Sequence, residues 1–179
     1  YQQEEATDMG LPLPATAERF ERLEETLQIA LRMWSGEESS FEAAHYQLAK
    51  PVSSPPPLTK PHPPILIGGA GEQKTLRLVA RYADACNLFD IPDEGATVRR
   101  KLDVLRRHCE AEGRPFEAVE KTLSTRFSPE DSPAAFVERC KLASSWGIEH
   151  VVLVTKGPWT VERVRNVASA IPALQEMPA

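Results

Sequence analysis

The feature that most constrains the fold is a strand-and-helix unit that the chain repeats four times from Pro64 onward. Short apolar runs predict strands, and these lie at 65–67, at 84–89, within 121–127 and at 151–154. Apolar residues at helical spacing predict the helices, over about 72–82, over about 94–112, from Ser132 onward and as one final helix through Val161 and Ile171. Strands that alternate with helices indicate a parallel sheet and an α/β fold.

Two architectures fit this alternation. One is a small open, doubly wound sheet, and the other is four consecutive units of a (β/α)8 TIM barrel. A complete barrel needs roughly 250 residues. The chain has 179 residues, which is room for about half of one. Topology by itself leaves both architectures open.

The region before Pro64 has a different pattern. Residues 1–15 are polar and are expected to form a loop. A helix is predicted from Thr16 to about Trp34, with Gly36 at its C-terminal end, and a short strand or hairpin is predicted around Phe41–Leu48. One face of that helix carries apolar side chains, namely Phe20, Leu23, Leu27, Ala30, Leu31 and Trp34.

Residues 51–64 hold seven of the sixteen prolines, which predicts an extended surface segment. We interpret it as an excursion before a buried strand. We therefore expect residues 1–179 to belong to a single domain, and the family resemblance described below implies that they form its C-terminal part. Residues 16–63 would supply a helix, a hairpin and a proline-rich insertion, and residues 64–175 the four units.

Composition excludes several kinds of function. The net charge is -5, and no basic stripe suggests a nucleic-acid partner. No apolar run approaches the length of a membrane span. Three widely spaced cysteines indicate reduced, buried thiols in a cytoplasmic protein, and no Cys/His set has metal-ligand spacing. The chain starts at Tyr1 without a signal pattern, so we expect the sequence to begin partway along a longer protein.

The strongest chemical signal is the turn Gly68-Gly69-Ala70-Gly71, between a predicted strand and a predicted helix. Glycines allow a ligand to approach the backbone, and a helix start offers unpaired N–H groups to an anion. The alternative is a tight turn without a ligand. The nearby Lys74 and Arg77 could support a phosphate or could be ordinary surface charge.

Asn87 lies inside an apolar strand, where its amide needs partners; it could face a ring ligand at the C-terminal mouth or be a satisfied structural residue. Cys86 would point to the other face. The histidines are expected to be structural, with His108 solvated on a helix and His150 at the wrong strand end for catalysis. No catalytic set is visible, so the catalytic residues remain unknown.

Four stretches, in this order and spacing, resemble the C-terminal half of luciferase-like monooxygenases, especially their coenzyme F420-dependent branch. They are Arg19–Gly36, Phe41–Tyr46, His62–Gly71 and Ala80–Asn87. The resemblance implies a (β/α)8 barrel in which this chain holds strands five to eight. It also implies that the cofactor phosphate lies on Gly68, Gly69, Ala70 and Gly71, with Asn87 lining the same mouth. The family often has Gly-Trp where this chain has Ala85-Cys86.

The resemblance implies an oxidoreductase that uses F420, or alternatively FMN, for hydride transfer or monooxygenation of a small organic substrate. The family's first four strands would have to come from a missing N-terminal half, or the chain would form a homo-oligomer. The competing hypothesis is a non-catalytic truncated barrel or a small doubly wound module that binds a phosphate-bearing ligand or a protein partner.

Overall fold

A computed structural model of the chain describes residues 3–128, 131–155 and 157–177. The chain divides into two compact units, Tyr1–Pro63 and Pro64–Ala179. The boundary coincides with the end of the proline-rich segment. That both units belong to one barrel domain stays a prediction.

The first unit contains two helices and a hairpin: α1 (Gln3–Asp8), α2 (Thr16–Trp34), β1 (Phe41–Glu42) and β2 (Gln47–Leu48). The prediction of a loop over residues 1–15 was wrong for Gln3–Asp8. This segment contains glutamine, glutamate and alanine, which favour helices, and it forms the short helix α1. The predicted helix over 16–34 and the hairpin are confirmed. Gly36 has a φ of 84°, as its place after the helix requires.

A single carboxylate ties α2 to the hairpin. Glu25 accepts backbone hydrogen bonds from Ala44 (3.1 Å), His45 (3.0 Å) and Tyr46 (3.0 Å). These three N–H groups lie in the turn between β1 and β2, where the two-residue strands leave them without ladder partners. The hairpin is therefore positioned by a helix side chain more than by its own short strands.

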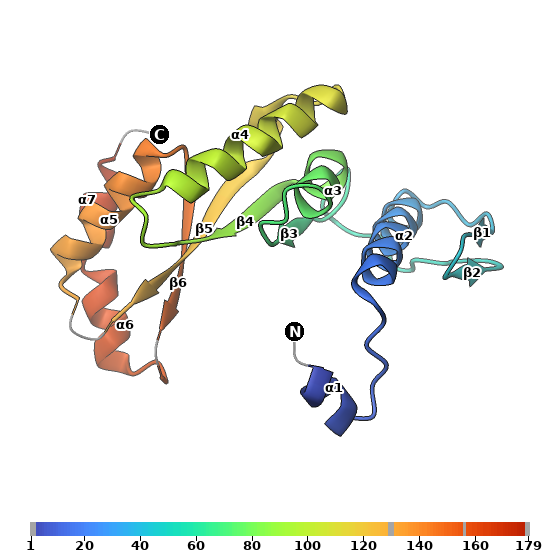
Figure 1. Ribbon diagram of the computed structural model, residues 1–179, viewed down its shortest axis with the longest axis horizontal. Helices are drawn as coiled ribbons and strands as arrows, with labels where there is room; N and C mark the ends of the chain where they lie inside the picture. Colours follow the sequence, from blue (N-terminus) through green and yellow to red (C-terminus); the bar gives the residue numbers. More distant parts are fainter. Residues whose placement is uncertain (1–2, 129–130, 156, 178–179) are drawn as a thin grey trace. The chain divides into compact units, whose positions relative to one another are not determined.

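The second unit holds a four-stranded parallel sheet in the order β3-β4-β5-β6 (Figure 1). The strands are β3 (Leu66–Gly68), β4 (Ala85–Phe89), β5 (Glu120–Phe127) and β6 (His150–Thr155). The helices between and after them are α3 (Thr75–Tyr82), α4 (Ala96–Ala111), α5 (Pro133–Ser145), α6 (Val161–Ala168) and α7 (Ile171–Gln175), and a short 3-10 turn, η1, spans Phe116–Ala118. All four predicted strands are confirmed.

Two helix predictions need correction. The helix predicted from residue 72 begins at Thr75, because Glu72–Lys74 form a separate turn after the glycines. The single final helix is broken into α6 and α7. Pro172 has no N–H to continue the α6 ladder and instead occupies the first turn of α7.

Strand order distinguishes the two architectures that the sequence left open. Neighbouring strands follow chain order, and helices pack on one face only: α4 runs alongside β4 and β5, and α5–α7 flank β6 (Figure 1). A doubly wound sheet instead reverses its strand order at a switch point and carries helices on both faces. The second unit is therefore a segment of a singly wound α/β barrel.

The core lies between this sheet and its helices. One cluster joins Leu76 of α3, Leu88 of β4, Leu102 of α4 and Leu123 of β5. A second cluster joins α5 to β6 and to the final helices, around Phe136 and Cys140. The opposite face of the sheet remains open. Its apolar side chains are exposed, namely Leu66, Phe89, Val152 and Val154.

Acidic residues before two of the strands fix the start of a neighbouring strand. Asp84 precedes β4 and accepts the backbone N–H of Ile65 at 2.7 Å. Glu149 precedes β6 and accepts the backbone N–H of Lys121 at 2.8 Å, while its other oxygen pairs with the Lys121 ammonium at 3.1 Å. These contacts hold the N-terminal ends of the strands and thereby set the register at their C-terminal ends.

Candidate functional site

The C-terminal ends of the four parallel strands meet at one edge of the sheet, as they must in a parallel arrangement. Gly68 of β3 lies opposite Asn87 of β4, and Asn87 lies opposite Thr122 of β5. The predicted glycine turn leaves β3 at this edge. The two strongest sequence-predicted features, the turn and Asn87, are thus neighbours in the structure.

The turn needs glycine at two positions. Gly69 has a φ of 121°, a conformation that side-chain-bearing residues rarely adopt, and a Cβ there would lie 3.2 Å from the Thr75 methyl. A Cβ on Gly71 would lie 2.8 Å from the Thr75 hydroxyl. Thr75 is buried at the start of α3 and packs beneath the turn. By contrast, a Cβ on Gly68 would meet nothing within 4 Å, so the approach from that side is open.

Backbone N–H groups of the turn remain available to a ligand. The Gly69 N–H bonds to the Asn87 carbonyl at 3.1 Å, which ties the turn to β4. Within the described part of the chain, the N–H groups of Ala70, Gly71 and Glu72 donate to no protein acceptor. Consecutive free N–H groups just before a helix form a cradle for an anionic oxygen.

A carboxylate next to this cradle is neutralised from α4. Glu72 pairs with Lys101 at 2.7 Å and with Arg100 at 3.2 Å, and the hydrogen bond from Lys101 lowers the pKa of Glu72 below its ordinary value. His108 is not solvated as predicted; its Nε2 lies 2.7 Å from the Glu72 carbonyl oxygen. The α4 side chains therefore hold the backbone of the turn and reduce repulsion toward an approaching anion.

The Asn87 side chain belongs to a polar group on the open face. Its Nδ2 donates to the Thr122 hydroxyl at 2.8 Å, and its Oδ1 accepts from the Ser124 hydroxyl at 2.9 Å. The Thr122 hydroxyl in turn donates a hydrogen bond to the Cys86 carbonyl at 2.9 Å. Since an amide has a second N–H and a second lone pair, Asn87 keeps capacity for a ligand. Whether it uses that capacity stays a prediction.

The structure reveals partners that the sequence reasoning missed. Thr75, Thr122 and Ser124 were not singled out. Thr122 and Ser124 stand at alternate positions of β5 and so share one face, but β5 holds several other polar residues, and the two hydroxyls carry no distinct signal in the sequence. Lys74 occupies the position before α3, and Arg77 lies in its first turn. That either one supports a phosphate remains a prediction.

The other histidines have structural partners. His45 lies 2.9 Å from Glu21, His62 stacks on Trp34 with ring centroids 5.9 Å apart, and His150 lies 3.3 Å from Glu120 at the N-terminal end of β6. Over residues 3–128, 131–155 and 157–177, no group of three or more His, Cys, Asp or Glu could hold a metal ion. None of the described helices is long and apolar enough to cross a membrane.

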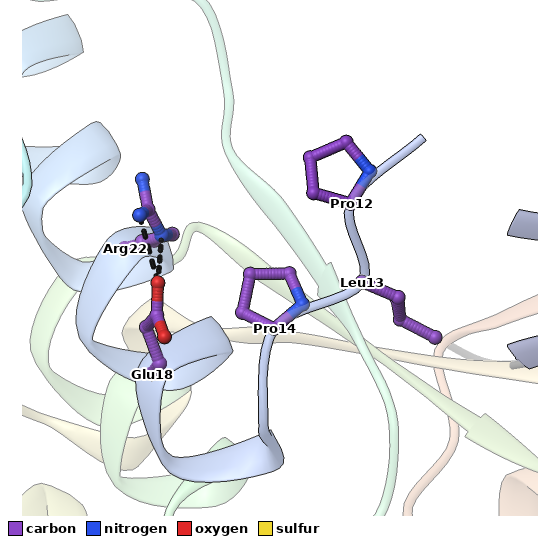
Figure 2. A pocket seen from close by; sticks show the side chains of 5 residues that line it. All are labelled: Pro12, Leu13, Pro14, Glu18 and Arg22. Atoms are coloured by element: carbon purple, nitrogen blue, oxygen red, sulfur yellow. Dashed lines mark hydrogen bonds and ion pairs between the residues drawn. The ribbon is translucent and has the colours of Figure 1, made fainter. Parts of the chain in front are cut away.

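In two pockets away from the glycine turn, the charged side chains are already paired with each other. One, of about 450 Å³, lies in the first unit beside Pro12–Pro14, and its charged residues, Glu18 and Arg22, pair with each other at 2.7 Å (Figure 2). Another, of about 800 Å³, lies in the second unit and contains the buried Lys121, which is paired with Glu149. In both pockets the charged side chains neutralise one another.

The three cysteines are buried and unpaired, as predicted. Cys86 lies on the helix-covered face of β4, opposite in direction to Asn87, and burial raises the pKa of its thiol to about 11. Burial also raises the pKa of Cys109 and of Cys140. Since the thiolate is the reactive form, these residues are poor nucleophiles at neutral pH.

This burial gives a simple expectation for thiol labelling. At pH 8 only about one part in a thousand of a thiol with this pKa is ionised, so Cys86 should react with iodoacetamide at least about 100-fold more slowly in the folded protein than after unfolding in urea. Mass spectrometry of the labelled peptides measures both rates. Equal rates in the two states would show that Cys86 is accessible and ionised.

Comparison with known proteins gives concordant matches. The family model described as luciferase-like monooxygenase matches residues 1–170. A protein of Kineococcus radiotolerans, named F420-dependent glucose-6-phosphate dehydrogenase, is 28% identical over 143 residues, which is 75% of this chain and 39% of that protein. The chain therefore spans well under half the length of this relative.

Solved structures match the fold at low identity. An F420-dependent secondary alcohol dehydrogenase, in complex with an F420-acetone adduct, superimposes with a TM-score of 0.79 and 13% identity, over 91% of this chain and 64% of that one. EDTA monooxygenase from Chelativorans sp. BNC1 superimposes with a TM-score of 0.76 and 15% identity, over 95% of this chain and 62% of that one. These neighbours are TIM-barrel enzymes, so the predicted α/β barrel class is confirmed for the part of the barrel that this chain supplies.

Proposed function

Because the chain belongs to the luciferase-like monooxygenase family, we propose that it supplies strands five to eight of a (β/α)8 oxidoreductase that uses coenzyme F420. The observation that carries the proposal is the cradle of free N–H groups at Ala70, Gly71 and Glu72, at the C-terminal edge of a parallel sheet. Ligands of TIM barrels bind at this edge. The site residues we propose for the cofactor are Gly68, Gly69, Ala70, Gly71 and Asn87.

The residues of the turn fit a phosphate group. Gly68 leaves an open approach, Gly69 provides the backbone conformation, and the neutralised Glu72 limits repulsion. Asn87 is held by Thr122 and Ser124, so its remaining N–H and lone pair have a fixed direction for orienting a ring. When bound, F420 would supply hydride transfer, whereas FMN would supply oxygen activation. The chain's own residues would bind and orient the cofactor.

The open face of the sheet supports completion of the barrel by an N-terminal half. Phe89 is 58% exposed and Val154 is 49% exposed, and β3 and β6 each leave one edge unpaired within the second unit. Exposed apolar side chains and strand edges of this kind need cover. We propose that the N-terminal half, in the same polypeptide or as a partner, provides it; a homo-oligomer is the alternative.

The choice of F420 over FMN rests on the relatives. Two proteins, from Kineococcus radiotolerans and Nakamurella multipartita, carry F420-dependent names, while a riboflavin lyase with modified FMN occurs among the structural neighbours. The substrate is proposed to be a small organic molecule. Three buried, unpaired thiols favour the cytoplasm as the compartment.

The proposal is tested by cofactor titration of the purified protein. We expect F420 to bind with a dissociation constant in the micromolar range or below and FMN to bind more weakly, as measured by quenching of cofactor fluorescence. Native mass spectrometry of the same sample shows whether the barrel is completed by the same chain, a partner or a second copy. If neither cofactor binds, the enzyme hypothesis fails, and a non-catalytic module is the better description.

A further inference from the structure

Arg126 lies at the C-terminal end of β5, on the same open face as Asn87 and Ser124. Side chains alternate along a strand, and the Ser124 hydroxyl contacts Asn87, so the residue two positions further points to the same side. Arg126 is exposed, whereas the intervening Thr125 is buried on the helix-covered face. The register places Arg126 opposite Val154 of β6.

The guanidinium of Arg126 has no acidic partner among the residues that the structure describes. Asp90 directly follows β4 at the same edge of the sheet, but it accepts its hydrogen bond from the Thr125 hydroxyl. The backbone of Arg126 is held from the other side, since Arg139 of α5 donates to its carbonyl. A fixed strand end therefore presents an unneutralised cation.

Exposed apolar side chains also lie on the open face near this cation. Val154 is 49% exposed and Phe89, which lies opposite Ser124, is 58% exposed on the same face. If this face is covered when the barrel is complete, the guanidinium loses much of its water. A charge in such a place is costly unless an opposite charge or hydrogen-bond acceptors reach it. A planar guanidinium suits the paired oxygens of a phosphate or a carboxylate.

We infer that Arg126 binds an anionic oxygen group, a phosphate or a carboxylate, on a ligand held at the C-terminal mouth of the sheet. The inference deepens the proposed function and rests on it for the location of the mouth. The anionic group has two possible sources, namely the substrate and the acidic tail of the cofactor. The backbone N–H groups of Ala70, Gly71 and Glu72 would hold one anion, and the Arg126 side chain would hold a second.

The test compares Arg126→Gln and Arg126→Lys with Arg106→Gln. Arg106 lies near Phe116 at the opposite end of β5, with its guanidinium 4.4 Å from that ring, so the control removes one positive charge away from the mouth. Inorganic phosphate, F420 and the deazaflavin chromophore without its phosphate and acidic tail serve as probes. Binding is measured by calorimetry on the purified protein, with phosphate titrated in both the presence and absence of F420.

Loss of one charge-assisted contact is expected to weaken binding by roughly 10- to 100-fold. If Arg126→Gln weakens phosphate binding to the F420-loaded protein and leaves F420 affinity unchanged, the anion belongs to the substrate. If it weakens F420 but not the tailless chromophore, the anion is the cofactor tail. Arg126→Lys should retain part of the affinity in either case, and Arg106→Gln should retain all of it.

Unchanged affinity for every probe in Arg126→Gln overturns the inference, even if the wild-type protein binds F420 normally. If the wild-type protein binds inorganic phosphate in an Arg126-dependent manner but binds no F420, the inference stands and the proposed cofactor is wrong. If it binds neither phosphate nor F420, both are overturned. Circular dichroism of each variant confirms that the fold is retained.

Discussion

Replacing Gly69 with aspartate is expected to weaken F420 binding by at least about 100-fold, which corresponds to about 2.7 kcal/mol. Three effects act together. The φ of 121° disfavours any side chain, the new Cβ would lie 3.2 Å from the Thr75 methyl, and a carboxylate would stand beside the proposed phosphate position. Fluorescence titration of wild type and variant measures the difference.

Gly113→Asp is the matched control for this variant. Gly113 also has a positive φ, of 67°, but a Cβ there would meet nothing within 4 Å and the residue follows α4, outside the proposed site. It should lose some stability and keep full cofactor affinity. Equal affinity of wild type and Gly69→Asp would remove the glycine turn from the cofactor site.

A smaller substitution, at Gly71, tests whether crowding against Thr75 by itself weakens cofactor binding. Gly71→Ala would place its Cβ 2.8 Å from the Thr75 hydroxyl, and Thr75→Ala in the same protein removes that hydroxyl. Recovery of affinity in the double variant shows that Gly71 is required for steric reasons. Failure to recover indicates that the Thr75 hydroxyl, which no sequence motif indicated, itself contributes to binding.

Replacing Leu123 with alanine is expected to lower the free energy of unfolding by about 2–5 kcal/mol. Leu123 is 1% exposed in β5 and packs in the cluster that joins α3, α4 and β4, so its truncation leaves a cavity between the sheet and its helices. Urea unfolding followed by tryptophan fluorescence measures the change. Trp146 packs against the same cluster and reports on it directly.

Leu142→Ala provides the comparison, since Leu142 lies on α5 but is 48% exposed. Its truncation should change the free energy of unfolding by no more than about 0.5 kcal/mol. A similar loss in the two variants would mean that the cluster around Leu123 is not the core of the second unit. Neither residue belongs to the proposed site, so cofactor affinity of the folded protein should be unchanged in both.

Much of the fold could be predicted from the sequence because local patterns carry it. Apolar runs, together with their alternation with helices, identified all four strands, and helical spacing identified α2, α4 and α5. Ser132 accepts a hydrogen bond from Ala135 at the start of α5, as its position before Pro133 suggests. Local patterns failed at element ends. The turn after Gly71 delays α3 to Thr75, and Pro172 divides the final helix.

The site could be predicted only in part. Glycines after a strand carry a local signal, so Gly68–Gly71 were found, and an amide in an apolar strand drew attention to Asn87. Thr122, Ser124 and Arg126 carry no such signal, because they lie some 35 to 40 residues from Asn87 in sequence and meet its face only through the pairing of β4 with β5. Likewise, the link from Glu72 to Lys101 exists only because α3 packs beside α4.

The sequence by itself determined the alternation of strands and helices and the glycine turn, since each depends on neighbours within a few residues. It could not choose between a doubly wound sheet and a barrel segment, because that choice depends on which strands pair and which face the helices cover. The tertiary structure decided this through the order β3-β4-β5-β6 with one open face. The same pairing decided which polar side chains stand beside the turn, because parallel strands bring their C-terminal ends to one edge.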